Sequence, residues 1–385
     1  MGDLKPGWKR VKFGEVVRLN KETCKDPETA GINRVIGMEH LEPGDLRVRS
    51  WADVADGTTF SNRVRPGQVL FGKRRAYQRK VAVADFDAIC SGDIYVFESA
   101  DPTKLLQELL PFICQTDSFL EYAVGTSAGS LSPRTNWKSL AEYEFALPPL
   151  EEQRRMVKLL VKQAILLSHW KELKTSAEQA RRAYLLDVFE SPKCQFMPVE
   201  DIGHVTMGRQ RAPRYQDGPQ PRRYLRVANV FDGFIDESDV LSMHFSDSEF
   251  EKYRLLPGDV LLNEGQSRHL VGRSAIVDKL NGDYAFQNTL IRFRAREVEP
   301  EYAHAFFQYC LYSGKFAKIA SQTTSIAHLG ASKFAKLLVP VLQVDKRQEI
   351  IGALEAFNAV LREFLQRDGA LQAFRSALMC ELVAP

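Results

Sequence analysis

Hydrophobic and polar positions follow two kinds of pattern along the chain, and each kind occurs twice. Residues 7–149 and 195–341 carry short apolar runs separated by Gly, Pro and Asp, a pattern typical of strands bounded by turns. Each stretch also contains a predicted helix, over residues 105–115 and 301–312, so we predict that both are mixed α/β. The predicted strands are residues 69–71, 81–83 and 94–97 in the first stretch and residues 260–262, 274–277 and 290–293 in the second.

The second kind of pattern is a long run of apolar residues at three- and four-residue spacing. It covers residues 151–189 and 346–383, and a helix of that length would extend roughly 55 Å at about 1.5 Å per residue. No single globular core is so long, so the pattern predicts two long helices paired as a coiled coil. The alternative is that each run breaks into shorter helices packed on its own α/β part, with Gly369 as the candidate break in the second run.

The second half of the chain repeats the first at a nearly constant offset. Gly44 corresponds to Gly233 at an offset of 189, and Gly67, which follows a proline, corresponds to Gly258 at an offset of 191. Ordered correspondences at nearly one spacing are hard to obtain by chance, so we predict one α/β-plus-helix unit used twice. The other correspondences are Pro149 with Pro340 and Arg182 with Arg375.

These patterns divide the chain into four segments. Residues 1–149 and 192–342 form the two α/β domains, residues 150–191 form a central long helix, and residues 343–385 form a C-terminal long helix. The predicted fold class is α+β, with two similar mixed α/β domains, two long coiled-coil helices and a pseudo-twofold internal repeat.

The composition is that of an ordinary globular protein. Hydrophobic residues make up 44% and charged residues 26% of the 385 residues, which excludes a disordered or fibrous protein. Six scattered cysteines form no C-x-x-C pair, which argues against a structural zinc site or a disulfide framework and fits a reducing cytosol. The sequence has no signal peptide and no apolar run near the ~18 residues of a membrane span. We therefore expect a soluble, cytoplasmic protein without a membrane segment.

A search for catalytic motifs yields one candidate, a phosphate-binding loop. Residues 67–73 match the G-x-x-x-x-G-K spacing, but Arg74 follows where Ser or Thr would hold magnesium. The second copy has Asn263 and Glu264 in place of the final Gly and Lys, so the spacing is not repeated. The sequence contains no other nucleotide-binding, methyltransferase, protease or hydrolase motif, and its histidines lack ligand spacing. We expect a non-catalytic chain with no metal site and no cofactor of its own.

Positive charge is concentrated locally, although the 52 Lys and Arg against 49 Asp and Glu leave a net charge of only +3. Residues 61–90 hold seven basic and two acidic side chains, and residues 207–228 hold six and one, with tyrosines between them. Such segments suit phosphate clamping and the reading of base edges. The alternative is a solvated basic face. Residues 125–138 and 322–329 add a loop with small hydroxyl side chains in each unit, suited to close approach to a sugar-phosphate chain.

Residues 146–157 carry the most specific motif of the chain. The run L-P-P-L-E-E-Q-R within them opens a long helix and follows an α/β unit that contains a P-G-x-[VIL]-L strand. This combination resembles the specificity (S) subunit of type I restriction-modification systems, and together with the repeat the resemblance covers essentially the whole chain. In the second copy, residues 339–348 keep only one proline of the motif.

The resemblance implies an organisation and a set of partners. The two α/β domains would be target recognition domains, each reading one half of a bipartite double-stranded DNA target, and the two helices would pack antiparallel as the spacer that fixes the gap. Two modification subunits would bind S-adenosylmethionine and methylate adenine. Restriction subunits would add translocation and cleavage with ATP and Mg²⁺. The alternatives are a protein–protein scaffold with basic patches and a stand-alone DNA-modifying enzyme.

Individual DNA contacts do not follow from the resemblance, because recognition domains differ with the sequence that they read. We choose candidates by side-chain chemistry: Arg can pair bidentately with guanine, Asn or Gln can pair with adenine, and other basic residues bind phosphate. The candidate DNA-binding residues are Lys73, Arg74, Arg75, Tyr77, Arg79, Arg134 and Asn136 in the first domain and Arg209, Arg211, Arg226, Asn263, Gln266, Arg268 and His328 in the second.

Overall fold

The structure is a computed structural model that describes residues 4–190, 192–210, 218–322 and 325–383. It divides into two compact units. The first unit comprises residues 1–173 and 364–385, and the second unit comprises residues 174–363. No helix within the described ranges is both long and apolar enough to cross a membrane.

The α/β part of the first unit is built on two four-stranded sheets and a two-stranded one. The first sheet is antiparallel, with the order β2-β9-β6-β7, and the second has the order β4-β3-β8-β5 with β3 parallel to β8. The third pairs β1 with β10. The elements are β1 (Lys9–Lys12), α1 (Phe13–Val16), β2 (Val17–Asn20), β3 (Arg34–Ile36), η1 (Met38–His40), β4 (Ala52–Asp53), η2 (Val54–Asp56), β5 (Asn62–Val64), β6 (Val69–Gly72), η3 (Ala76–Gln78), β7 (Val81–Val83), β8 (Ala88–Cys90), β9 (Ile94–Ser99), α2 (Leu110–Ile113), α3 (Asp117–Gly125), α4 (Trp137–Ala141) and β10 (Glu144–Leu147).

The second unit repeats this arrangement. Its antiparallel sheet has the order β12-β19-β15-β17, β13 lies parallel to β18, and β11 pairs with β22 as β1 pairs with β10. A small sheet of the order β16-β21-β20 is added. The elements are β11 (Gln195–Pro198), α6 (Val199–Ile202), β12 (Gly203–Met207), β13 (Pro221–Leu225), β14 (Leu241–His244), α7 (Asp247–Tyr253), β15 (Asp259–Asn263), β16 (Gly265–Gln266), β17 (Ser274–Ile276), β18 (Ala285–Phe286), β19 (Leu290–Ala295), α8 (Pro300–Tyr312), α9 (Lys315–Ile319), β20 (Ser321–Gln322), β21 (Ala327–His328), α10 (Ala331–Ala335) and β22 (Leu338–Val341).

Matching hydrogen bonds confirm the repeat at the level of single residues. The Gly67 amide donates to the Ala84 carbonyl at 2.7 Å, and the Gly258 amide donates to the Val277 carbonyl at 2.8 Å. Gly67 and Gly258 have φ angles of +86° and +88°, which favour glycine because side chains with a Cβ are strained there. The predicted correspondence of the two Pro-Gly turns is therefore correct for a physical reason.

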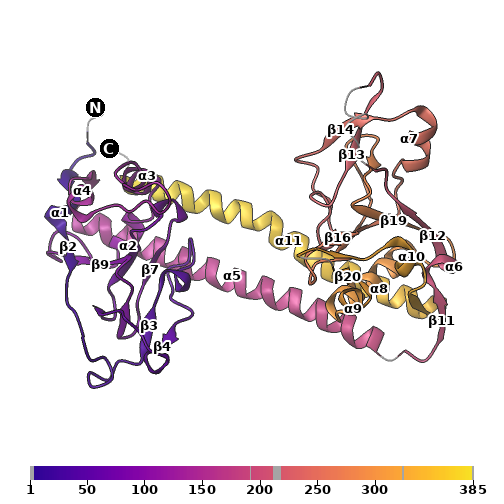
Figure 1. The fold of residues 1–385 in the computed structure, drawn as a ribbon. Helices are drawn as coiled ribbons and strands as arrows, with labels where there is room; N and C mark the ends of the chain where they lie inside the picture. The colour runs from indigo at the N-terminus through magenta and orange to yellow at the C-terminus, as the bar shows by residue number, and fades with distance from the viewer. Residues whose placement is uncertain (1–3, 191, 211–217, 323–324, 384–385) are drawn as a thin grey trace. The chain divides into compact units, whose positions relative to one another are not determined.

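Two long helices, α5 (Leu150–Glu190) and α11 (Val344–Val383), run through both units, and Figure 1 draws each as one uninterrupted helix. In the first unit the start of α5 packs against the end of α11, where the rings of Trp170 and Phe364 lie 4.6 Å apart. In the second unit the end of α5 packs against the start of α11, with the rings of Tyr184 and Phe357 5.9 Å apart. The helices are thus antiparallel, and α11 continues through Gly369 without a break.

Each unit has its own hydrophobic core, to which the long helices contribute. In the first unit Met156 and Leu160 of α5 join a core rich in aromatic rings, and in the second unit Leu185 and Phe189 do so. This arrangement confirms the predicted fold class, which combines two similar mixed α/β domains, two long antiparallel helices and an internal repeat.

The six predicted strands all occur, as does the helix predicted over residues 301–312, but the helix predicted over residues 105–115 is wrong. Residues 106–110 form turns with bonds to the third residue back, such as Leu109 to Leu106, and the α-helix covers only Leu110–Ile113. Pro111 explains the difference. It has no N–H to donate and disfavours helical continuation from the preceding residues, so a helix can begin there but cannot run through it.

Candidate nucleic-acid interface

Three segments of the first unit meet at one junction. The Lys73 amide donates to the Asp93 carbonyl at 2.9 Å, which joins the loop after β6 to the turn before β9. The Thr135 amide donates to the Lys73 carbonyl at 3.1 Å, and Arg74 forms a β-bridge with Arg134, which brings in the polar loop before α4. We call residues 73–75, 93 and 134–135 the first loop junction. It unites the two loops that the sequence marked separately as DNA-binding.

The Asp93 carboxylate lies at the centre of this junction. It accepts from Arg134 Nε at 2.8 Å and Arg134 Nη2 at 3.3 Å, and it forms an ion pair with Arg74 Nη1 at 3.0 Å. The Asp93 side chain is 18% exposed, whereas those of Arg74 and Arg134 are 40% and 49% exposed. The hydrogen bond from Arg134 lowers the pKa of Asp93, with help from the charges of Arg134, Arg74 and Lys73. The carboxylate is therefore ionised at neutral pH, and the guanidinium groups reach solvent.

The other candidates of the first domain surround this junction. Arg75 and Arg79 both adopt left-handed backbone conformations, with φ angles of 54° and 57°, at the two ends of η3. The Arg75 amide is held by the Pro133 carbonyl at 2.7 Å, and the Arg79 side chain pairs with Asp117. The tight turn between them carries the exposed ring of Tyr77. Lys73 Nζ lies 4.9 Å from the centre of the Tyr95 ring, and Asn136 caps α4 by accepting from the Ser139 amide at 2.8 Å.

The second unit contains a junction of the same construction with different side chains. The Glu264 amide donates to the Thr289 carbonyl at 2.9 Å, and the Leu329 amide donates to the Glu264 carbonyl at 2.8 Å. We call residues 264–266, 289 and 327–329 the second loop junction. Strand pairing sets Gly265 opposite His328, whose Nδ1 lies 3.0 Å from Glu264 Oε2. By these bonds, Lys73 and Asp93 correspond to Glu264 and Thr289.

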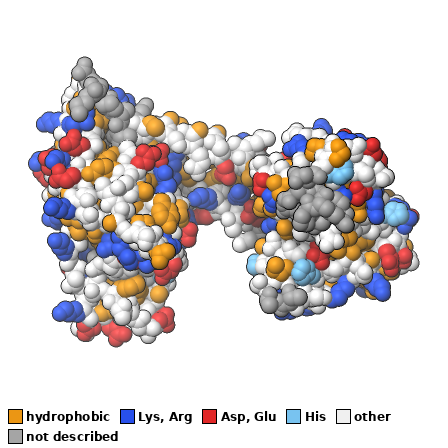
Figure 2. Space-filling view, turned by 45° about the horizontal axis from the view of Figure 1, so that its top comes forward, with side chains coloured by type: hydrophobic (Ala, Val, Ile, Leu, Met, Phe, Trp, Pro, Cys, Tyr) orange, Lys and Arg blue, Asp and Glu red, His pale blue; other side chains and the backbone are white. Residues whose placement is uncertain are grey.

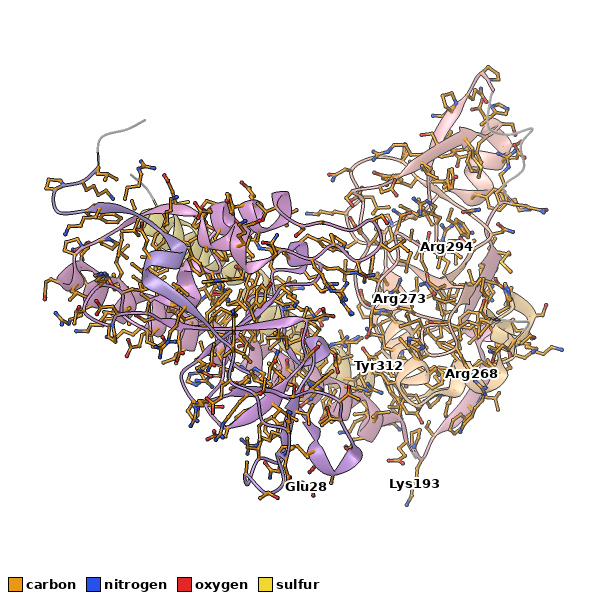
Figure 3. The ribbon with its side chains drawn as sticks, turned by 60° about the vertical axis from the view of Figure 1, so that its left-hand side comes forward. Glu28, Lys193, Arg268, Arg273, Arg294 and Tyr312 are labelled. Carbon is orange, nitrogen blue, oxygen red and sulfur yellow. The ribbon has the colours of Figure 1, made fainter. Side chains whose placement is uncertain are left out.

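The candidates of the second domain do not all reach this junction. Gln266 belongs to it, and Arg268, labelled in Figure 3, is exposed in the turn that follows. Arg226 pairs with Asp239, and Arg211 lies outside the described residues.

Two candidates of the second domain are buried in its interior. Arg209 is 5% exposed and is held by Glu249, by the His244 carbonyl and by the Phe245 ring. The Asn263 side chain is fully buried and donates to the Val230 carbonyl at 3.3 Å. These surroundings suit packing roles, because a buried side chain needs a rearrangement before it can contact a base.

Comparisons with known proteins agree with this architecture. The family model described as type I restriction modification DNA specificity domain matches residues 5–167. The chain is 30% identical over 128 residues to the type I restriction enzyme EcoDI specificity subunit of Escherichia coli, a match that covers 31% of this chain and 28% of that protein. Over these residues the chain is similar to type I restriction-modification specificity subunits.

A second curated protein matches part of the chain, and solved structures match its whole fold. The EcoKI specificity subunit of Escherichia coli strain K12 is 25% identical over 138 residues, covering 35% of this chain and 30% of that protein. The matches therefore span less than a third of each curated relative. The S subunit of a type I restriction-modification system from M. genitalium covers 100% of this chain and 98% of its own, with a TM-score of 0.58 at 13% identity. A chain from a structure concerned with assembly and conformational transition of the type I R-M system covers 99% of both chains, with a TM-score of 0.62 at 18% identity.

The positive charge of the two basic segments is partly compensated in the folded chain. On the face that Figure 2 presents, Lys and Arg lie interspersed with acidic and hydrophobic side chains over each unit. In the first unit, Arg63 and Arg65 both pair with Glu22, which is remote in sequence. Acidic side chains from other parts of the chain therefore reduce the local positive charge of residues 61–90 and 207–228. The further pairs are Arg63 with Asp87, Arg74 with Asp93, Arg79 with Asp117, Arg209 with Glu249, Arg222 with Asp247 and Arg226 with Asp239.

Sequence reasoning missed the acidic members of both junctions. Asp93 and Glu264 are single carboxylates without a motif around them, and only the folded loops bring them to their basic neighbours. One signal was present: Asp93 directly precedes the predicted strand at residues 94–97, where a polar residue at a strand end often faces a neighbouring loop.

Proposed function

We propose that this chain is the sequence-specific DNA-binding specificity subunit of a type I restriction-modification complex, in which each α/β domain reads one half of a bipartite target. The observation that carries the proposal is the duplicated loop junction. The same backbone frame occurs in both domains, but it holds arginines around Asp93 in one and the Glu264–His328 pair in the other. A common frame with different polar side chains suits two domains that read different base pairs.

In this proposal the partner subunits carry out the chemistry. Two modification subunits would bind S-adenosylmethionine and methylate adenine in each half-site, and restriction subunits would bind ATP and Mg²⁺ and cleave. The chain itself would be a non-catalytic, cytoplasmic subunit. The internal repeat supports two copies of one partner, because each unit has a similar sheet topology.

DNA binding would combine two kinds of contact. Basic side chains on phosphate supply affinity that falls as salt rises, and side chains on base edges supply discrimination of about 1–3 kcal/mol for each good bidentate pair. In the first domain Arg74 and Arg134, which share the Asp93 carboxylate, are suited to base edges, and Arg79, which pairs with Asp117 outside the junction, is suited to phosphate.

The decisive experiment is methylome sequencing of cells that carry this chain with its modification subunits, combined with gel shifts of the purified complex at two salt concentrations. We expect methylated adenines within one bipartite motif and tighter, salt-sensitive binding to DNA that contains it. Absence of salt-sensitive binding by the chain and by its complex would favour a scaffold role. Methyl transfer or cleavage by the purified chain alone would show an enzyme instead.

A further inference from the structure

We propose that Asp93 is a positioning residue that holds Arg74 and Arg134 as a guanine-reading pair, so that the half-site of the first domain contains guanine. This inference rests on the proposed function and deepens it, because it names a base and the side chains that read it. Its starting point is the number of bonds that converge on one carboxylate: three nitrogens from two arginines lie within 3.3 Å of the Asp93 oxygens.

The Arg134 guanidinium turns one edge toward Asp93, and a second edge remains available for binding a base. Arg134 uses Nε and Nη2 toward the carboxylate, at 2.8 and 3.3 Å. A guanidinium has five N–H donors in a planar fork, so Nη1 and the second hydrogen of Nη2 stay free of Asp93 and point away from it. Guanine offers two acceptors, O6 and N7, on its major-groove edge, and a pair of parallel N–H donors matches them.

The carboxylate also determines which base is read. A free Asp at a DNA interface would accept from the amino group of cytosine, but both Asp93 oxygens are already occupied by arginine nitrogens. The Asp93 backbone is fixed as well, since its carbonyl accepts from the Lys73 amide. A fixed carboxylate restricts the rotamers of the long Arg74 and Arg134 side chains before DNA binds, which lowers the entropy lost on contact.

The junction keeps an excess of positive charge for DNA. Lys73, Arg74 and Arg134 surround the single Asp93 carboxylate, and their influence lowers the pKa of that group. Asp93 therefore orients the arginines without cancelling their attraction to DNA.

The second loop junction shows why the inference is confined to the first domain. The position of Asp93 is taken by Thr289, that of Lys73 by Glu264, and His328 lies opposite Gly265 as Arg134 lies opposite Arg74. The side chains there are Glu264 and His328 in place of an arginine pair, so the second half-site is read by other chemistry.

The test uses the complex of the full chain with its modification subunits and a DNA pool randomised in both half-sites. The variant D93N removes the charge and keeps the shape of the side chain. The wild-type complex should select guanine at one or more positions of one half. D93N should reduce discrimination against the other bases at those positions by between about 5-fold and 150-fold, the range that one bidentate contact supports, and should leave the other half unchanged.

Three further variants separate positioning from stability. D93E, which keeps the carboxylate, should recover part of the guanine preference, and R134K, which keeps the charge but loses the planar fork, should not. The matched control is D117N, which removes the partner of Arg79 from a single exposed pair in the same unit. The D117N variant should change the affinity of the complex for all DNA sequences by the same factor. If D93N does not fold, R134K serves as the test instead. Arg134 is half-exposed, so its substitution should have little effect on folding.

The outcomes are distinguishable. A first-domain half-site without guanine would overturn the inference, and so would unchanged base preference in D93N or, if D93N does not fold, in R134K. Loss of preference in both half-sites at once would show that Asp93 acts on stability. If the wild-type complex selects no sequence at all, the proposed function itself fails.

Discussion

At the scale of single residues, the surroundings of a charged group decide its role more than its type does. Arg209 and Arg134 were chosen by the same reasoning, yet Arg209 is enclosed by Glu249 and Phe245 whereas Arg134 keeps half of its surface in solvent. Removing the partner of a buried charge costs several kcal/mol, while an exposed pair contributes little to stability. Arg134 is therefore available for binding in a way that Arg209 is not.

His304 shows how burial controls titration in the second unit. Its side chain lies on α8 and is 8% exposed, and its Nε2 donates to the Ser274 carbonyl at 3.2 Å. Burial lowers the pKa of His304 to about 4, against the effects of the Ser274 bond and of the Asp232 charge. Because the folded value lies below the ordinary value of about 6.5, the stability contribution is complete above pH 6.5 and is lost as the pH falls from 6.5 toward 4.

We expect the free energy of local opening of α8 to fall by about 2 kcal/mol between pH 7.5 and pH 5 on account of His304. Hydrogen exchange with mass spectrometry on α8 peptides measures this directly. The variant H304Q keeps a donor for the Ser274 carbonyl and should remove most of the pH dependence. The control H269Q changes an exposed histidine of the same unit and should leave it intact. Equal pH dependence in H304Q and the wild type would contradict the assignment.

At the scale of elements, the long helices anchor the domains by a repeated contact. Arg375 of α11 donates to Gln115 Oε1 at 2.5 Å in the first unit, and Arg181 of α5 donates to Gln308 Oε1 at 2.6 Å in the second. Each α/β domain is thus held by an arginine from the C-terminal half of a long helix. The helices contribute to stability by such contacts and by apolar packing, since isolated helices are only marginally stable in water.

Gly369 offers a test of helix continuity. It is exposed within the C-terminal half of α11, and a Cβ added there would meet nothing within 4 Å. The variant G369A should therefore stabilise the helix by about 0.5–1 kcal/mol, because alanine loses less backbone entropy than glycine.

The first unit contains all four tryptophans, Trp8, Trp51, Trp137 and Trp170, so fluorescence follows its melting separately. We expect G369A to raise the midpoint of thermal unfolding of the first unit by roughly 1–4 °C. The opposing variant G369P should lower it, because proline in a helix interior costs about 3 kcal/mol. A lower midpoint for G369A would show that glycine is needed at this position.

At the scale of the whole molecule, the C-terminal part of α11 completes the core of the N-terminal domain. Met379 of α11 belongs to the core of the first unit, and Arg375 also donates to the Gly44 carbonyl at 3.0 Å. The first unit is therefore assembled from residues 1–173 and 364–385, although these segments are far apart in sequence. We therefore expect folding of the first domain to depend on the last helix.

Removing residues 364–385 should destabilise the first unit selectively, because it deletes Met379 from the core to which Leu160 of α5 also belongs. Limited proteolysis with mass spectrometry should then show new cleavage sites within residues 7–149, while residues 192–342 stay protected. A variant with only R375A, which removes the polar anchor and keeps the apolar contacts, should give a weaker form of the same change. New cleavage confined to residues 192–342 would contradict this assembly.

Much of the architecture could be predicted from local patterns. The six strands, the repeat and the long helices depend on apolar spacing, turn residues and positive-φ glycines such as Gly67 and Gly258, which act within a few residues along the chain. The helix predicted over residues 105–115 failed because the position of Pro111 outweighed the apolar spacing.

The candidate site was predictable only in part. Lys73, Arg74 and Arg134 were identified as separate basic residues of two loops, but their meeting at Asp93 depends on hydrogen bonds between segments some 20 and 40 residues apart in sequence. The burial of Arg209 and Asn263 likewise follows from packing that no local pattern encodes.

The sequence by itself determined that this protein is one α/β-plus-helix unit used twice, because periodicity and turn chemistry are properties of neighbouring residues. Only the tertiary structure decided which charges are compensated and which remain exposed. Electrostatic pairing depends on distance in space, and the acids that pair with Arg65, Arg79 and Arg134 come from other segments of the chain.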